Sequence, residues 1–251
     1  MKKRIISFIP KNEYVPSYAP KPEPASNNLP KWWRDAEAYP NGMQVINGTV
    51  QQTVKKCPGI QDLLFTGYVL KFPSDVYVDT TGDEIIYEAL EIHKQSFSIH
   101  IKEQIDKWDF DRKEFMDSAF RIHPMWVIST TPGTSTLFIH PPYRENLPFR
   151  TIPAIIDTDT YVSDGPFSVL IKRNFKGIIK QGTPLVQCIP YLREEWNSEI
   201  LEKPEIKTFI RTPKAVEVIY LHKAIQEKLV ELLRNKHGRN NVTPEHPAFA
   251  G

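Results

Sequence analysis

Short apolar runs separated by turn residues fill the chain between residues 126 and 190. Runs bounded by Pro, Gly, Asn and Asp are typical of β-strands in a compact all-β unit. They predict strands at 126–129, 134–140, 152–160, 167–171, 177–180 and 184–189. In the second of these, Leu137 and Ile139 should lie on one face and Phe138 on the other, because side chains alternate along a strand.

The part of the chain before residue 126 also alternates in short stretches. The pattern predicts strands at 5–9, 49–56, 65–71, 76–79 and 84–89. Residues 80–83 form a hairpin signal between the last two of these strands. The highly charged range 102–118 is expected to be a solvated connector, with a helix at 111–119. These ranges make the prediction mainly β.

Six prolines between residues 10 and 31 predict an extended arm with little regular structure. The arm ends at Trp32 and Trp33. These two rings could form a platform on which a ligand stacks, or they could anchor the arm to the core. The size of a Trp side chain favours the anchor. We therefore expect the arm to dock on the rest of the protein.

The clearest helical pattern lies near the C-terminus. Thr212 suits an N-cap position, Pro213 suits the first helical position, and Gly238 suits the stop. Apolar residues between them recur at helical spacing. They are Val218, Leu221, Ile225, Leu229 and Leu232. This stripe predicts a helix that buries one face against the sheet or against another subunit.

Charge and cysteine content limit the classes of function. The 32 basic and 30 acidic residues leave a net charge of +2, which gives no electrostatic footprint for nucleic acid. Cys57 and Cys188 show no CxxC spacing, so we expect neither a disulfide framework nor a structural zinc site. No stretch approaches the ~20 apolar residues of a membrane-spanning helix. We expect a protein of the reducing cytoplasm with no membrane partner.

Asp157 and Asp159 are unusual because acidic residues are depleted within strands. At positions i and i+2 of one strand they would share a face. One interpretation is that the face is wet, or that Asp157 caps the turn before Tyr161. The other is a catalytic carboxylate site that orients a water, a ligand hydroxyl or a cation. The sequence leaves both open.

The range 157–187 resembles the core of the β-clip fold of dUTPases and dCTP deaminases. The matching features are the strand with Asp157 and Tyr161, a strand ending near Asn174, and the 182–187 hairpin with Gln187. The resemblance implies that Asp157 holds a sugar hydroxyl and a water, and that Tyr161 lies under the sugar. Tyr143 and Arg144 stand where that family has an Arg-Ser segment that binds phosphate. Of that pair only the Arg has a counterpart here, Arg144.

A second resemblance, to an uncharacterised domain family of bacteria and bacteriophages, rests on more of the chain. It includes Trp126, the 131–133 turn, Pro141, the Asp157 strand and the 182–184 corner. That family has no established activity, so the resemblance implies a fold and a context but no mechanism. If the protein is encoded by a phage, the host cytoplasm is its expected location.

These observations predict a mainly β protein with a β-clip or barrel-like core. The expected organisation is an N-terminal strand and arm at 1–44, a β core at 45–196, and a C-terminal helix and tail at 197–251. The leading interpretation is a non-catalytic accessory protein that binds a partner or a small polar ligand and forms a homo-oligomer. The alternative is an enzyme acting on a nucleotide or similar metabolite, with ligand contacts from Tyr143, Arg144, Tyr161 and Gln187.

A third interpretation, a cupin-type metalloenzyme, is weaker. Glu91 and His93 would share a strand face, but no His-x-His or His-x-Asp pair accompanies them. Cys57 follows two lysines that would lower the pKa of a thiol, yet no motif brings a His to it. We therefore predict no metal site and leave the identity of any cofactor open.

Overall fold

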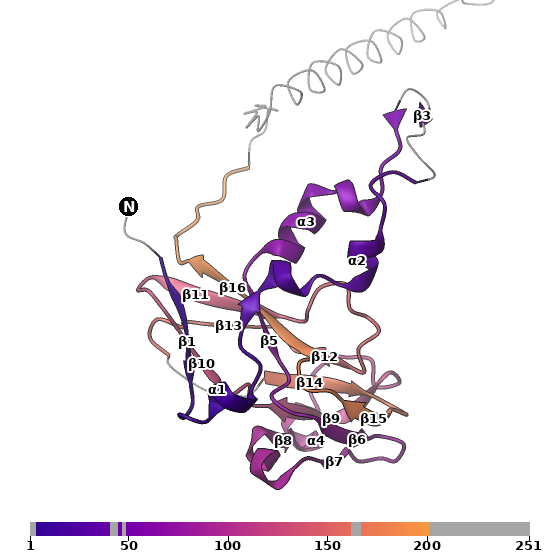
Figure 1. The fold of residues 1–251 in the computed structure, drawn as a ribbon, viewed down its shortest axis with the longest axis vertical. Coiled ribbons are helices and arrows are strands. Elements are labelled where there is room, and N and C mark those ends of the chain that lie inside the picture. Colours follow the sequence, from indigo (N-terminus) through magenta and orange to yellow (C-terminus); the bar gives the residue numbers. More distant parts are fainter. Residues whose placement is uncertain (1–3, 41–44, 47–48, 162–166, 201–251) are drawn as a thin grey trace, which may run out of the picture. The chain divides into compact units, whose positions relative to one another are not determined.

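The computed structural model describes residues 4–40, 45–46, 49–161 and 167–200 (Figure 1). Contacts divide the chain into two units, Met1–Glu195 and Trp196–Gly251. All the strands and helices described below lie in the first unit. The expected helix at 213–236 lies outside the described residues. Within them, no helix is long and apolar enough to cross a membrane.

Antiparallel sheets form the first unit, which confirms the mainly β prediction. The largest sheet contains, in spatial order, β13 (Ala154–Ile156), β11 (Thr134–Ile139), β16 (Pro184–Leu192), β5 (Tyr68–Lys71) and β2 (Glu23–Pro24). A four-stranded sheet contains β12 (Phe149–Thr151), β14 (Phe167–Lys172), β9 (Phe115–Ile122) and β8 (Phe97–His100). In the described part of the chain no sheet closes on itself, so the expected barrel is not seen.

Three smaller sheets complete the β structure. They are β15 (Lys176–Ile179) with β6 (Val76–Asp79) and β7 (Ile86–Glu88), then β1 (Ile6–Pro10) with β10 (Trp126–Thr130), and β3 (Val45–Ile46) with β4 (Thr49–Val50). The helices are short: α1 (Val15–Tyr18), α2 (Lys31–Asp35), α3 (Pro58–Phe65) and α4 (Lys102–Ile105), with 3-10 turns η1 (Ala25–Asn28), η2 (Val54–Lys56) and η3 (Glu91–Ser96).

Several predicted elements need correction. Of the expected strand at 152–160, only β13 (Ala154–Ile156) is a strand, and it is followed by a turn that begins at Asp157. The expected strand at 49–56 is short β4 followed by the 3-10 turn η2. The expected helix at 111–119 is wrong, because Phe115–Ile122 is strand β9, paired on both sides. The aspartates at 157 and 159 therefore lie in a turn and not within a strand.

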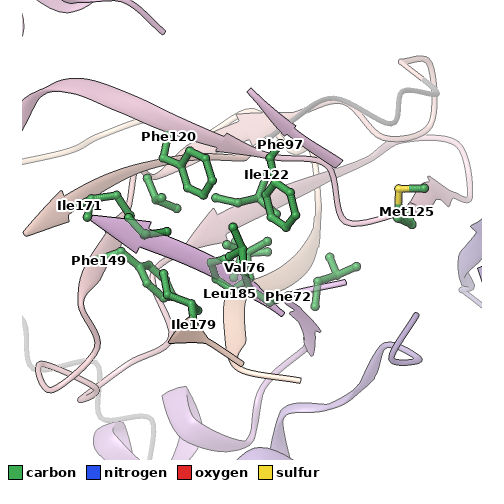
Figure 2. Packing of buried hydrophobic residues seen from close by; sticks show 14 of the residues in the cluster. Phe72, Val76, Phe97, Phe120, Ile122, Met125, Phe149, Ile171, Ile179 and Leu185 are labelled. Atoms are coloured by element: carbon green, nitrogen blue, oxygen red, sulfur yellow. The ribbon is translucent and has the colours of Figure 1, made fainter. Parts of the chain in front are cut away.

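The main core lies between the sheets and is rich in aromatic side chains (Figure 2). Phe97 and Phe120 stack with ring centroids 5.5 Å apart, and Phe72 meets Phe149 at 5.1 Å. Phe138 is buried on this side, while Leu137 and Ile139 are half-buried on the other face of β11, as the alternation predicted. A smaller cluster of Ile105, Phe115, Ala119 and Leu170 covers the opposite face of the four-stranded sheet.

Candidate functional site

Asp157 and Asp159 are both held by one arginine that the sequence did not single out. Arg193 donates two bonds to Asp159, of 2.8 Å to Oδ1 and 2.6 Å to Oδ2. The same guanidinium lies 3.1 Å from Asp157 Oδ1, which also accepts a 2.5 Å bond from Ser135 Oγ. Asp159 Oδ2 accepts a further bond from the backbone N–H of Gly133. Both carboxylates therefore have cationic or hydroxyl partners within the protein.

The turn at Asp157 rests on a buried cluster of threonines. Thr158 Oγ1 lies 2.8 Å from Thr130 Oγ1 and 2.8 Å from Thr136 Oγ1. The backbone N–H groups of Thr160 and Tyr161 donate to the Asp157 carbonyl and close the turn. These bonds fix the turn that directs the two aspartates toward the end of β16. The arrangement matches the interpretation in which Asp157 belongs to a turn before Tyr161.

Asp159 is the better protected of the two carboxylates, with a side chain only 4% exposed. The Arg193 guanidinium and the Gly133 N–H lower the pKa of Asp159 to about 2. Since the folded-state pKa lies below the ordinary value of 3.8, the ion pair stabilises the fold above about pH 4. This contribution is lost as the pH falls toward 2.

We expect Asp159→Asn to be less stable than the wild type at pH 7, with the difference shrinking between about pH 4 and pH 2. Chemical unfolding midpoints measured across this range test the prediction. Arg193→Gln should remove the same acid-sensitive component, because it deletes the other partner of the ion pair. A stability difference that stays constant down to pH 2 would contradict the role given to Arg193.

The other residues predicted for the site lie elsewhere. Tyr143 and Arg144 follow the end of β11, whereas Ser135, which binds Asp157, lies near its start. Arg144 donates to the backbone carbonyl of Asn28. Among the described residues, no hydrogen bond, ion pair or ring contact joins Tyr143 or Arg144 to either aspartate. The structure thus separates the expected phosphate contact from the expected catalytic carboxylate.

Among the described residues, the side chains of Gln187 and Tyr161 form no hydrogen bond to either aspartate, although the Tyr161 N–H closes the Asp157 turn. Gln187 is buried, and its Nε2 donates to the carbonyls of Leu63 and Thr66 at 2.8 and 2.7 Å, which ties β16 to the end of α3. Tyr161 is 60% exposed and lines a hollow of about 20 Å³ beside Trp126. In this structure Gln187 therefore anchors a helix, and Tyr161 borders a space too small for a nucleoside.

A much larger cleft, of about 670 Å³, opens between the β6–β7 loop and the four-stranded sheet. The loop between β6 and β7 supplies one wall, and β8, α4 and β9 supply the other. Its apolar lining consists of Ile85, Ile99 and Ile101, of which Ile85 is buried and Ile101 is 56% exposed. A volume of this size accommodates a small organic ligand.

Charged side chains divide the cleft into two parts. In one part, Asp117 accepts from Arg112 at 3.0 Å and from Arg173 at 3.1 Å, with Lys102 Nζ at 3.9 Å, and these cations lower the pKa of its carboxyl. The remaining carboxylates of the lining belong to Asp83, Glu84 and Glu103. Within the described residues, these three have neither an ion pair nor a hydrogen bond to their side chains. The cleft therefore offers three unpaired carboxylates beside an aliphatic wall, while its two cations, Lys102 and Arg173, lie against Asp117.

Sequence reasoning missed both Arg193 and the cleft. The spacing of Asp83 and Glu84 marks only a hairpin, and Glu103 lies in a range interpreted as solvated connector. Only the packing of α4 beside the β6–β7 loop brings these carboxylates to one opening. Among the described residues, no three His, Cys, Asp or Glu side chains are grouped closely enough to hold a metal. Comparison with known protein families and with curated proteins finds no match for this chain.

Proposed function

We propose that this is a non-catalytic binding protein whose cleft receives a small ligand with a positively charged amino group and a short apolar body. The observation that carries the proposal is the cleft of about 670 Å³ with an isoleucine-lined wall. Such a wall takes the apolar part of a ligand, and polar groups at its edge fix the orientation. This cleft thus has the form of a binding site.

The charges of the cleft favour a cation. Asp117 is paired with Arg112, Arg173 and Lys102, so it offers no free negative charge, and the ligand cation must be met by the other carboxylates of the lining. An ammonium group near Asp83, Glu84 or Glu103 would meet carboxylates without internal partners. At about 4 Å in water each such pair contributes about 1 kcal/mol, and more where solvent is partly excluded. The selectivity for cations should therefore come from these three residues.

The alternative, an enzyme that acts through Asp157, needs a carboxylate free to hold a water or a substrate hydroxyl. In the structure Asp157 and Asp159 are engaged by Ser135 and Arg193. This geometry supports the binding protein over the enzyme. The resemblance to the bacterial and phage domain family, and a cytoplasmic location, remain part of the proposal.

Calorimetric titration with three matched six-carbon compounds tests the cleft. We expect hexylamine to bind, and neutral hexanol and anionic hexanoate to bind at least tenfold more weakly, because only the amine gains from the carboxylates. Asp83→Asn combined with Glu103→Gln should weaken hexylamine binding at least tenfold. The control Glu194→Gln removes one exposed carboxylate outside the cleft and should leave the affinity unchanged.

Two outcomes would contradict this function. Equal binding of the three compounds would show that the carboxylates do not select the ligand. A failure of all three to bind, together with a thermal shift by nucleotides that Asp157→Asn abolishes, would favour the enzyme. The stability of each variant is measured alongside, so that a loss of folding is not taken for a loss of binding.

A further inference from the structure

A second surface, around α2, carries the opposite charge to the cleft. Trp33 is 4% exposed and anchors this helix, whereas its neighbours Trp32 and Arg34 face solvent. Aromatic and basic side chains gather around them, beside the ion pair of Lys31 and Asp35. We call this region the α2 surface and define it by Trp32, Arg34, Lys55, Lys56, Tyr143 and Arg144. None of these residues lines the cleft.

The aromatic part of the α2 surface is held in place by a specific contact. The rings of Trp32 and Tyr143 meet edge to face, with centroids 5.8 Å apart, and Trp32 Nε1 donates to the Tyr143 carbonyl at 3.1 Å. Tyr143 has a φ of 57°, a left-handed conformation that bulky residues rarely adopt. Trp32 and Tyr143 nevertheless stay 39% and 41% exposed. The protein thus holds two aromatic rings in fixed positions at its surface.

Two guanidinium groups lie beside these rings without a carboxylate partner. Arg144 donates to the Asn28 carbonyl, a neutral acceptor. Burial lowers the pKa of Arg144, and the nearby positive charge of Arg34 lowers it further. Within the described part of the chain, neither arginine forms an ion pair, and Asp35 of α2 is bound by Lys31. Like charges in this arrangement favour a bound anion.

Two lysines extend the positive charge past the end of α2. Lys55 Nζ donates to the carbonyls of Arg34 and Ala36, at 3.2 and 2.7 Å, which places its charge at the C-terminus of the helix. Lys56 Nζ lies 5.5 Å from the centre of the Tyr39 ring. Positive charge and aromatic rings therefore occur together on this surface, although the net charge of the whole chain is only +2.

We propose that the α2 surface binds single-stranded nucleic acid, with bases stacked on Trp32 and Tyr143 and phosphates bound by Arg34 and Arg144. Proteins that bind single strands combine basic groups along the backbone with aromatic rings under the bases. A guanidinium also fits the planar, bidentate geometry of a phosphate. An acidic peptide would use the arginines but would leave the exposed rings without a function. This role goes beyond the binding of a small cation in the cleft.

Fluorescence anisotropy of a fluorescein-labelled twelve-nucleotide oligo(dT) tests the proposal with the full chain. We expect Arg34→Gln to weaken binding about three- to tenfold at low salt and to lower the slope of log K against log salt by about 0.7, one phosphate contact on a single strand. Trp32→Leu should weaken binding about tenfold through lost stacking. Lys113→Gln, which removes an exposed positive charge elsewhere, should leave the affinity unchanged.

Arg34 suits the test because its side chain makes no hydrogen bond within the described residues, so Arg34→Gln should keep the fold and the binding of hexylamine in the cleft. The proposal is overturned if oligo(dT) fails to bind, or if Arg34→Gln and Lys113→Gln behave alike. It is also overturned if a duplex or a poly-glutamate peptide of equal charge binds as tightly, because either result would remove the role of exposed bases.

Discussion

Phe120→Ala is expected to destabilise the fold by about 3–5 kcal/mol, the range measured for loss of a buried aromatic ring. Phe120 is fully buried in β9, where its ring stacks on Phe97 (Figure 2). It also meets the ring of Tyr87 at a centroid distance of 5.1 Å. Its strand is paired on both sides, with Ile99 and Val169 as its direct neighbours. Truncation would leave a cavity that this paired backbone cannot collapse to fill.

Urea unfolding followed by intrinsic fluorescence measures this loss. Phe65→Ala makes the same chemical change at a position that is 43% exposed, and it should cost less than about 1 kcal/mol. Phe120→Leu should fall between the two, since it keeps part of the buried volume. If Phe120→Ala and Phe65→Ala lowered the midpoint equally, the stacked aromatic core could not be the main source of stability.

Gly67→Ala is expected to cost about 2–5 kcal/mol, which combines two separate penalties. Gly67 has a φ of 79°, a conformation that disfavours any Cβ. A Cβ at this position would also lie 2.1 Å from the carbonyl oxygen of Cys188 in β16. The close approach of the Gly67 and Cys188 backbones accompanies the hydrogen bond from Gln187 to the carbonyl of Thr66 at the end of α3. The backbone must therefore move if residue 67 gains a side chain.

Gly182→Ala separates the two penalties. Gly182 has nearly the same φ, 81°, but no atom lies within 4 Å of a Cβ built there. It should therefore lose only the conformational part, about 1–2 kcal/mol. Comparing the two variants by chemical unfolding isolates the contact with Cys188. Equal losses would mean that α3 and β16 can separate without cost, which the bonds of Gln187 argue against.

The net charge of +2 averages over two regions of the molecule that carry opposite charge. A value of +2 predicts no affinity for polyanions when the charge is spread evenly. In the fold, unpaired carboxylates gather at the cleft while arginines and lysines gather on the α2 surface. Each proposed ligand would meet a local charge that the average conceals.

Where one face of a strand is buried, the sequence alone determined the local structure. The boundaries 76–79 match β6, and the alternation around Phe138 placed that ring in the core. The hairpin at 80–83 follows from its turn residues, and β6 pairs with β7 as expected. These features depend on interactions between residues that are close in sequence, so a short stretch of the chain is enough to predict them.

Only the tertiary structure decided the features that depend on distant partners. Phe115, Met116, Ala119 and Phe120 have a spacing that also fits a helix, because both faces of β9 are buried and its alternation is lost. Pairing with β8 and β14 makes it a strand. In the same way, Arg193 reaches Asp159 across 34 residues, and α4 closes the cleft beside the β6–β7 loop. No local sequence pattern predicts such a contact, because its two partners meet only once the sheets have assembled.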